Sequence, residues 1–297
     1  MKKLLLSISL VLAFGVSQAQ NLFTENFDTF TSLAASGWSQ TNQSNPVGAS
    51  TWAQGGGTAF ATAYNGAATS FTLCNYNSTT GAGTISNWLI TPTVVLENGD
   101  VISFYTRQGG TTVSYADNLE LRISTNGAFT SAPSAGIADV GDYTTLAAEI
   151  NPTLDPAGYP LTWTQYTYTM SGLTGPTECK LGFRYYVTDG GPLGANSNII
   201  GLDALSIDRP IMSTDSFFAQ NFAVYPNPAD NVINISNKNN TTLNQVQVTD
   251  LNGRVVKSIN ANGVATTQIN IADLTSGVYF LKATNSQGVG TTKFIKK

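Results

Sequence analysis

Histidine is absent from the 297-residue sequence, and charged residues make up only 11% of it. Without histidine the chain cannot hold a Ser-His-Asp or Cys-His nucleophile, a histidine-ligated zinc ion or an imidazole proton shuttle. Soluble chains carry about a quarter charged residues, whereas here Thr, Ser, Asn and Gly fill the polar positions. The composition is typical of an exported β protein, and any acid–base chemistry would have to rest on carboxylates.

Cysteine is scarce too. Cys74 and Cys179 are far apart in the sequence, and neither belongs to a Cys-x-x-Cys pair, so a thiolate metal site is not expected. Two alternatives stay open for them. In an oxidising compartment they form one disulfide, which contributes about 4 kcal/mol in the chain-entropy model, or they are two buried free thiols.

Only the N-terminus carries a long apolar run. Met1–Lys3 is basic, residues 4–16 are apolar, and residues 17–19 form a small-x-small cleavage site. This pattern predicts a signal peptide over residues 1–19, cleaved between Ala19 and Gln20. No other segment approaches the roughly 20 apolar residues of a membrane-spanning helix, so no transmembrane segment is predicted.

The charge changes sign along the chain. Residues 20–210 carry 5 Lys+Arg and 14 Asp+Glu, a net charge of −9, and residues 211–297 carry 7 and 4, a net charge of +3. The acidic segment 20–210, called the cargo below, is unsuited to binding nucleic acid, because affinity for phosphates comes mostly from Lys and Arg. Its charge is compatible with binding cations. The basic tail can bind an acidic partner, although an ordinary solvated surface also carries a net charge of this size.

A new domain begins near residue 223. Pro226 and Pro228 lack backbone donors, which places them at an edge or turn, and a strand begins near Val232. Short apolar runs follow at residues 245–249, 254–259, 267–271, 278–282 and 292–295. This spacing predicts a small sandwich of about seven strands, with a type I′ hairpin at Asn252–Gly253.

Four ordered motifs in this tail resemble the type A C-terminal sorting domain of the type IX secretion system of Bacteroidetes. They are Tyr225-Pro226-Asn227-Pro228, Asp250-Leu251-Asn252-Gly253-Arg254, Leu274-x-x-Gly277-Val278-Tyr279 and a Lys-rich end. The resemblance implies that the type IX machinery recognises residues 223–297 and that the domain is removed after export. It also implies a route through the periplasm to the outer cell surface or the medium.

The cargo, residues 20–210, is long enough for one large sandwich. Alternating apolar positions predict strands over residues 87–92, 100–105, 119–124, 165–170 and 180–187. Tyr166, Tyr168 and Met170 share one face of the fourth strand, and Trp163 lies on the other unless a bulge intervenes. Helix signals are nearly absent, and residues 31–84 and 125–160 are predicted to be rich in loops.

A second set of ordered motifs spans nearly the whole cargo and resembles the cleaved-adhesin or choice-of-anchor J domain, a jelly roll related in plan to MAM domains. The motifs are Phe23–Asp28, Gly37-Trp38, Trp52, Trp88–Pro92, Leu119–Ser124, Phe183–Tyr185 and Ile200–Ile207. The resemblance implies a surface binding or adhesion module for a glycan or protein ligand. The predicted fold class is therefore all-β, a jelly-roll sandwich followed by a small immunoglobulin-like sandwich.

The four tryptophans have two possible roles. Flat indole faces suit the apolar faces of sugar rings, but large aromatic side chains more often fill a core. Trp88, within an apolar strand, is expected in the core. Trp52, close to the glycine run 55–57, is predicted to be exposed and to bind ligand.

A calcium site is predicted where the cargo's first and last strands meet. Glu25 lies just before the first strand and Asp203 lies in the last, and in a jelly roll these strands are commonly neighbours. With Asp28 or backbone carbonyls, the two carboxylates would form an oxygen cage suited to Ca²⁺. Related domains of this plan often hold calcium near a terminus. The alternative is that the two carboxylates are separate, solvated charges.

Catalysis would need paired carboxylates across a cleft, as in jelly-roll glycosidases. Asp117, Glu120 and Arg122 lie on or near one strand, but Glu120 and Arg122 share a face and are predicted to form a surface ion pair. We therefore predict that the chain is not an enzyme. A carbohydrate-active hydrolase and a structural matrix component remain as alternative hypotheses.

The predicted organisation has four parts. Residues 1–19 are the signal peptide, 20–210 the jelly-roll cargo, 211–222 a polar linker and 223–297 the sorting domain. The predicted function is that of an exported binding or adhesion module delivered by type IX secretion.

Overall fold

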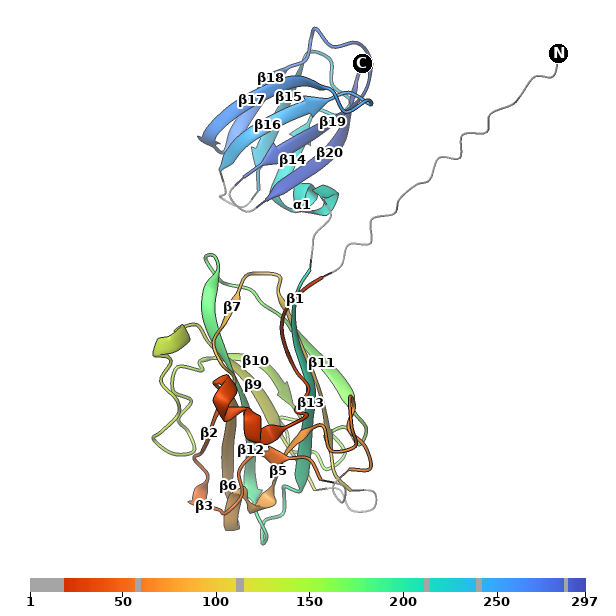
Figure 1. Cartoon of the computed structure of the whole chain (residues 1–297). Coiled ribbons are helices and arrows are strands. Elements are labelled where there is room, and N and C mark those ends of the chain that lie inside the picture. Colours follow the sequence, from red (N-terminus) through yellow and green to blue (C-terminus); the bar gives the residue numbers. More distant parts are fainter. Residues whose placement is uncertain (1–18, 57–59, 111–114, 211–213, 239–241, 286–287) are drawn as a thin grey trace, which may run out of the picture. The chain divides into compact units, whose positions relative to one another are not determined.

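The computed structural model divides the chain into two units, residues 19–210 and residues 211–297, each drawn in Figure 1. The structure describes residues 19–56, 60–110, 115–210, 214–238, 242–285 and 288–297. Residues 1–18 of the predicted signal peptide lie outside the described residues, and Gln20 begins the first strand, β1. Each unit buries a hydrophobic core of its own, so each is described by itself.

The N-terminal unit is a sandwich of two antiparallel sheets, as predicted. Sheet A has the order β11 (Thr164–Thr169), β8 (Val101–Gln108), β13 (Ile199–Arg209), β5 (Thr72–Asn75) and β4 (Ala53–Gln54), with β1 (Gln20–Glu25) also paired to β13. Sheet B has the order β10 (Thr145–Ile150), β9 (Leu119–Ser124), β12 (Thr177–Gly190), β6 (Thr79–Ile90) and β2 (Ser39–Asn42). Two short strands extend sheet B, namely β3 (Asn45–Val47) beside β6 and β7 (Val94–Leu96) beside β12.

The alternating patterns found in the sequence do mark strands. In β8, Ile102, Phe104 and Thr106 are buried and the residues between them are half-buried, which is the period of two that a half-covered sheet requires. The first and last strands are neighbours, since β1 pairs with β13 from Gln20–Arg209 to Glu25–Leu205. The stretches predicted to be rich in loops hold the 3-10 turns η1 (Phe30–Ser32), η2 (Ala34–Ser36), η3 (Tyr76–Ser78) and η4 (Gly127–Phe129). They also hold strands that were not predicted, namely β2 to β5, the first half of β6, and β10, which is as long as β9.

The two cysteines lie on different sheets, Cys74 on β5 and Cys179 on β12, and both are buried free thiols. Their sulfurs have separate local partners, because Cys74 Sγ lies 3.2 Å from the Ser78 hydroxyl and Cys179 Sγ donates to the Thr177 carbonyl. Of the two alternatives left open by the sequence, the structure therefore has the two free thiols and not the disulfide. Burial raises the pKa of Cys74 to about 12 and that of Cys179 to about 11, so both thiols are uncharged at neutral pH.

The C-terminal unit is a second sandwich. A three-stranded sheet has the order β14 (Phe222–Tyr225), β15 (Val232–Asn237) and β18 (Thr266–Asn270). A four-stranded sheet has the order β17 (Val255–Val264), β16 (Leu243–Thr249), β19 (Gly277–Thr284) and β20 (Val289–Lys296). These seven strands in the described residues agree with the predicted spacing.

Two details of this unit differ from the prediction. Residues 214–221 of the predicted linker form helix α1 (Thr214–Asn221), whose Phe218 is 3% exposed within the core of the C-terminal unit. A Cβ on Gly290 of β20 would lie 2.7 Å from the Phe218 Cα, so glycine there makes room for the helix. At the predicted type I′ turn, Gly253 has a positive φ of 79° but Asn252 does not, and the Asp250 carboxylate accepts the Asn252 and Arg254 backbone N–H groups.

No helix in the described part of the chain combines the length and apolarity that crossing a membrane requires.

Candidate functional site

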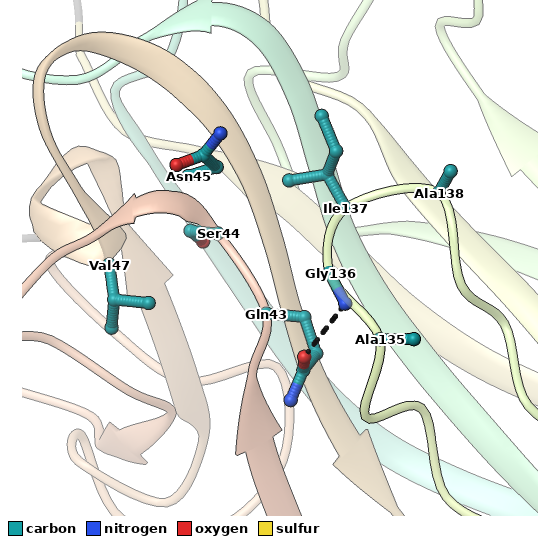
Figure 2. A pocket seen from close by; sticks show the side chains of 8 residues that line it. All are labelled: Gln43, Ser44, Asn45, Val47, Ala135, Gly136, Ile137 and Ala138. Carbon is teal, nitrogen blue, oxygen red and sulfur yellow. Dashed lines mark hydrogen bonds between the residues drawn. The ribbon is translucent and has the colours of Figure 1, made fainter.

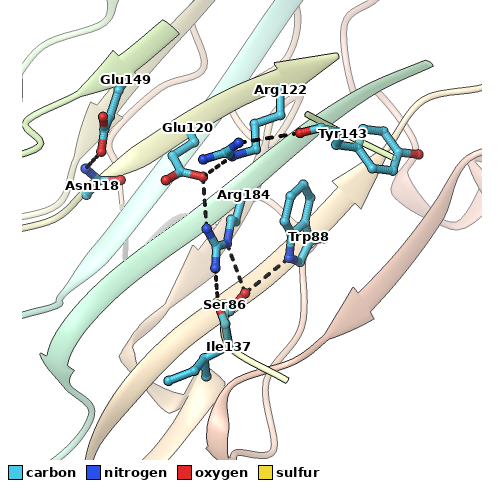
Figure 3. A network of polar contacts seen from close by, with 9 residues as sticks. All are labelled: Ser86, Trp88, Asn118, Glu120, Arg122, Ile137, Tyr143, Glu149 and Arg184. Carbon is cyan, nitrogen blue, oxygen red and sulfur yellow. Dashed lines mark hydrogen bonds and ion pairs between the residues drawn. The ribbon is translucent and has the colours of Figure 1, made fainter. Parts of the chain in front are cut away.

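The outer face of sheet B carries a buried network of charges rather than a solvated surface (Figure 3). Arg184 of β12 is 3% exposed, and its guanidinium donates to Glu120 Oε2 at 3.1 Å, to Ser86 Oγ at 3.0 Å and to the Ile137 carbonyl. Cross-strand pairing sets this contact, since Arg184 lies opposite Glu120 in the register of β12 and β9. All three guanidinium nitrogens therefore have acceptors.

Glu120 and Arg122 were predicted to form a surface ion pair, and the structure corrects this. Arg122 Nε lies 2.6 Å from Glu120 Oε2, but the Glu120 side chain is only 5% exposed. The loop 125–143 crosses this face of the sheet, so residues of outward parity become a second buried layer. Trp88 is also buried in this layer, with Ile90 and Tyr143, rather than between the two sheets.

The same loop forms one wall of a cavity of about 390 Å³ (Figure 2). The other wall is the segment 43–47, and the Gly136 N–H joins the walls by donating to Gln43 Oε1 at 3.2 Å. Asp139 holds the loop in shape, since its carboxylate accepts the backbone N–H groups of Ser134, Ala135 and Gly141. These bonds also hold the pKa of Asp139 below its usual range.

The lining of this cavity is uncharged and mixes polar with apolar groups. It consists of Gln43, Ser44, Asn45, Val47, Ala135, Gly136, Ile137 and Ala138. Val47 is 62% exposed, and the exposed Asn45 amide can both donate and accept. Sequence analysis missed this site, because its two walls are about 90 residues apart and neither carries a motif.

Trp52 is 1% exposed, and its indole N–H donates to the Asn87 carbonyl at 3.2 Å. The prediction of an exposed, ligand-binding Trp52 is therefore wrong: the indole belongs to the core between the sheets. Trp163 immediately precedes β11, and its ring packs against Phe60 and Phe71, whereas Tyr166 packs against the core between the sheets.

The predicted calcium ligands lie near one another, because β1 and β13 are paired, but they do not form the predicted cage. Asp203 is fully buried, and its Oδ2 accepts the backbone N–H groups of Tyr64 at 2.8 Å and Asn65 at 3.0 Å. Its Oδ1 accepts the Ala204 N–H, and Glu25 Oε1 accepts the Phe27 N–H at 2.8 Å.

Asp203 therefore anchors the loop around residues 64–65 rather than pointing a free carboxylate at a cation. Among the described residues no group of three His, Cys, Asp or Glu side chains is placed to hold a metal ion. Asp28 contributes only a repulsive charge that adds to the raised pKa of Asp203. The residues present do not fit the site as predicted, and Ca²⁺ binding by Glu25, Asp28 and Asp203 stays an untested prediction.

Asp117 is a second buried carboxyl group, at the start of β9. Its Oδ1 accepts the Tyr185 hydroxyl and, at 2.9 Å, the Asn198 N–H, whereas its Oδ2 is buried and has no partner in the described part of the chain. Burial raises the pKa of Asp117 to about 6, although both hydrogen bonds act in the other direction. Burial likewise raises the pKa of Asp203 to about 6.

These two groups predict that the N-terminal unit is more stable at pH 5 than at pH 7. A carboxyl group whose pKa is raised in the native state binds its proton first in that state, so stability increases as the pH falls through 6 towards the unfolded value near 4. Raising the pKa of Asp117 from its ordinary 3.8 to about 6 corresponds to about 3 kcal/mol of stability that is missing at pH 7.

Urea unfolding followed by tryptophan fluorescence tests this in the whole chain, because all four tryptophans lie in the N-terminal unit. Asp117→Asn, which keeps the acceptor for Tyr185 and Asn198, is expected to remove about half of the pH dependence. Asp189→Asn, at an exposed position near the C-terminal end of β12, is the control and should change nothing. Equal stability of the wild type at both pH values would contradict the prediction.

The predicted sorting residues lie along the two sides of the last strand. On one side, Gly277, Val278 and Tyr279 begin β19 and pair with Lys296, Ile295 and Phe294 of β20. On the other side, the Asn227 side chain accepts the Ile295 N–H at 3.0 Å and donates to the Lys293 carbonyl at 3.3 Å.

Ala229 continues this pairing by bonding to the backbone of Ile295 and Lys297. Pro226 and Pro228, which have no N–H to donate, flank Asn227 at this edge, and Tyr225 is 50% exposed. Two motifs that are about 50 residues apart in the sequence thus hold the same C-terminal strand.

Solved structures similar to the chain include adhesin domains. The K1 cleaved adhesin domain of Lys-gingipain from Porphyromonas gingivalis W83 is 19% identical, with a TM-score of 0.40, and the match covers 63% of this chain and 97% of that one. The adhesin domain of Epf from Streptococcus pyogenes is 12% identical, with a TM-score of 0.35, and the match covers 76% and 75%. No curated protein sequence matches the chain.

One family comparison concerns the C-terminal unit. Residues 223–297 match the family described as the secretion system C-terminal sorting domain, which covers all four motifs that resemble the type IX sorting domain. Such a domain marks its chain for export to the cell surface or for secretion. The C-terminal unit of this protein is therefore a secretion system C-terminal sorting domain.

Proposed function

We propose that this chain is an exported binding module whose N-terminal unit binds a neutral glycan in the cavity between residues 43–47 and 135–138. The observation that carries the proposal is the uncharged lining of that cavity. Sugar rings present both hydroxyl groups and apolar C–H faces, and sites for such ligands combine apolar walls with a few polar groups that fix orientation.

The construction of the cavity supports binding by a preformed site. Arg184, on the sheet that the loop covers, donates to the Ile137 carbonyl of the loop, and Asp139, within the loop, accepts the Gly141 N–H. The Asn45 amide and the Val47 side chain then lie on the opposite wall. A rigid wall lowers the cost of ordering on binding.

The hydrolase alternative has less support. Glu120 is the carboxylate of β9 that could serve as an acid or base, but it is buried and shares its Oε2 atom between Arg122 and Arg184. Because two guanidinium groups bind this buried carboxylate, it is not free to reach a substrate.

A glycan array with the purified chain tests the proposal. Ala138→Trp adds a large side chain at an exposed position in the lining and is expected to abolish binding of the glycans that the wild type retains. Ala68→Trp adds the same group at an exposed turn elsewhere and is the matched control. Binding of a protein ligand instead, no glycan binding by the wild type, or full binding by Ala138→Trp would each contradict the proposal.

A further inference from the structure

A second, smaller cavity of about 100 Å³ lies on the same face of sheet B, and it shares no residue with the first. Its lining residues are Asn118, Glu149, Pro152, Leu154, Tyr186 and Thr188. They come from the start of β9, the end of β10 with the loop after it, and the far half of β12. Tyr186 and Asn118 are joined by a backbone bond, from the Tyr186 N–H to the Asn118 carbonyl.

Asn118 is 2% exposed, and its hydrogen bonds settle which way its amide points. Its Nδ2 donates to Glu149 Oε1 at 3.1 Å and to the Asn151 carbonyl at 3.3 Å (Figure 3). Both partners are acceptors, so the other end of the amide must be the oxygen. That Oδ1 is buried and has no partner in the described part of the chain.

Besides Asn118, the lining offers the Glu149 side chain, whose carboxylate only accepts, and the Tyr186 and Thr188 hydroxyl groups, which can donate or accept. Glu149 is exposed and is the one charged residue in the lining. Arg184 lies against the Tyr186 ring, 3.8 Å from its centroid, but its three guanidinium nitrogens are already bonded to Glu120, Ser86 and Ile137. A ligand that completes this cavity must therefore supply hydrogen-bond donors.

We propose that this cavity binds a primary ammonium group, carried either by a lysine side chain of a protein partner or by an amino sugar. An ammonium has three donors and no acceptor, which matches the Asn118 Oδ1 atom and the Glu149 carboxylate. The aliphatic carbons next to the ammonium then lie against Leu154 and Pro152. The site is separate from the glycan cavity and does not depend on it.

Titration of the whole chain with Nα-acetyl-lysine methylamide and with glucosamine, followed by NMR, tests the proposal. At least one of them is expected to bind with a Kd of about 1 mM, whereas Nα,Nε-diacetyl-lysine methylamide and N-acetylglucosamine, which lack the ammonium, do not bind. Binding of the lysine derivative alone assigns a protein partner, and binding of glucosamine alone assigns a glycan.

Glu149→Gln keeps an acceptor for the Asn118 amide but removes the charge, so it is expected to weaken binding about tenfold without unfolding the chain. Glu178→Gln changes an exposed glutamate on β12 that does not line the cavity, and it is the matched control for general electrostatic attraction. The proposal is overturned if neither amine binds at about 10 mM, if the acetylated forms bind equally well, or if Glu149→Gln binds as tightly as the wild type.

Discussion

Removal of residues 211–297 is expected to leave a folded N-terminal unit that no longer reaches the cell surface. The two units have separate cores, and a domain that buries its own core can fold alone. The sorting domain is then absent, so export across the outer membrane is lost altogether and the truncated chain accumulates in the periplasm.

The boundary of the deletion matters. A cut at residue 222 would leave helix α1 on the truncated chain, and Phe217 and Phe218 would lose the C-terminal core against which they pack. A chain ending at Pro210 avoids exposing these aromatic rings. Cell fractionation and protease treatment of intact cells measure the location, and tryptophan fluorescence measures whether the unit is folded.

The converse experiment is the control. Residues 211–297 fused to an unrelated periplasmic protein are expected to carry that protein to the surface, whereas the same fusion with Asn227→Leu is expected to fail. Leucine cannot bond to Ile295 and Lys293, so this edge of β20 would lose two hydrogen bonds and keep those to the Ala229 backbone. Surface display of the chain that ends at Pro210 would refute the assignment of the sorting role to residues 211–297.

The largest loss of stability from a single substitution is expected for Arg184→Met. Removing one partner of a buried ion pair costs about 3–5 kcal/mol when the other charge stays buried, and in this variant Glu120 stays buried with Arg122 as its one remaining ion-pair partner in the described residues. Here the substitution also removes a donor from Ser86 and from the Ile137 carbonyl, and it removes the cation from the Trp88 and Tyr186 rings. Arg184 is 3% exposed, and this desolvation lowers its pKa.

Two further variants separate the charge from the packing. Arg122→Met is expected to cost less, since the Arg122 side chain is 16% exposed and the more deeply buried partner of Glu120, Arg184, remains. Glu120→Leu combined with Arg184→Met is expected to be more stable than Arg184→Met alone, because no carboxylate is then left buried. Urea unfolding that places Arg184→Met within about 1 kcal/mol of the wild type would show that the network contributes little.

Local patterns in the sequence were sufficient for the strands and the sorting domain. The strands that were predicted in both sandwiches follow from a period of two, which each of those segments carries by itself, whereas β5 and β10 lie in stretches that were predicted to be rich in loops. The tail motifs could be recognised because Pro226, Asn227 and Pro228 are consecutive: the prolines lack a backbone N–H, and the Asn227 side chain bonds to the backbone of β20. The pairing of β1 with β13 also followed, since a jelly roll commonly brings its ends together.

Local patterns failed wherever burial depends on a distant segment. Periodicity shows that Glu120 and Trp88 point away from the sandwich core, but not that the loop 125–143 covers that face. Trp52 looked exposed beside the glycine run 55–57, but its indole bonds to Asn87, 35 residues away. The segment of helix α1 was predicted to be a polar linker, because nothing in its local sequence shows that its two phenylalanines pack against the segment that contains Gly288 and Gly290.

The sequence by itself therefore determined the all-β class, the positions of the strongly alternating strands and the exported character of this protein, since each of these depends on neighbouring residues or on consecutive motifs. Only the tertiary structure decided where the charges are buried and where the cavities lie. Both cavities are lined by segments that are well separated in the chain, and which side chains meet there depends on how loops close over a sheet rather than on any local periodicity.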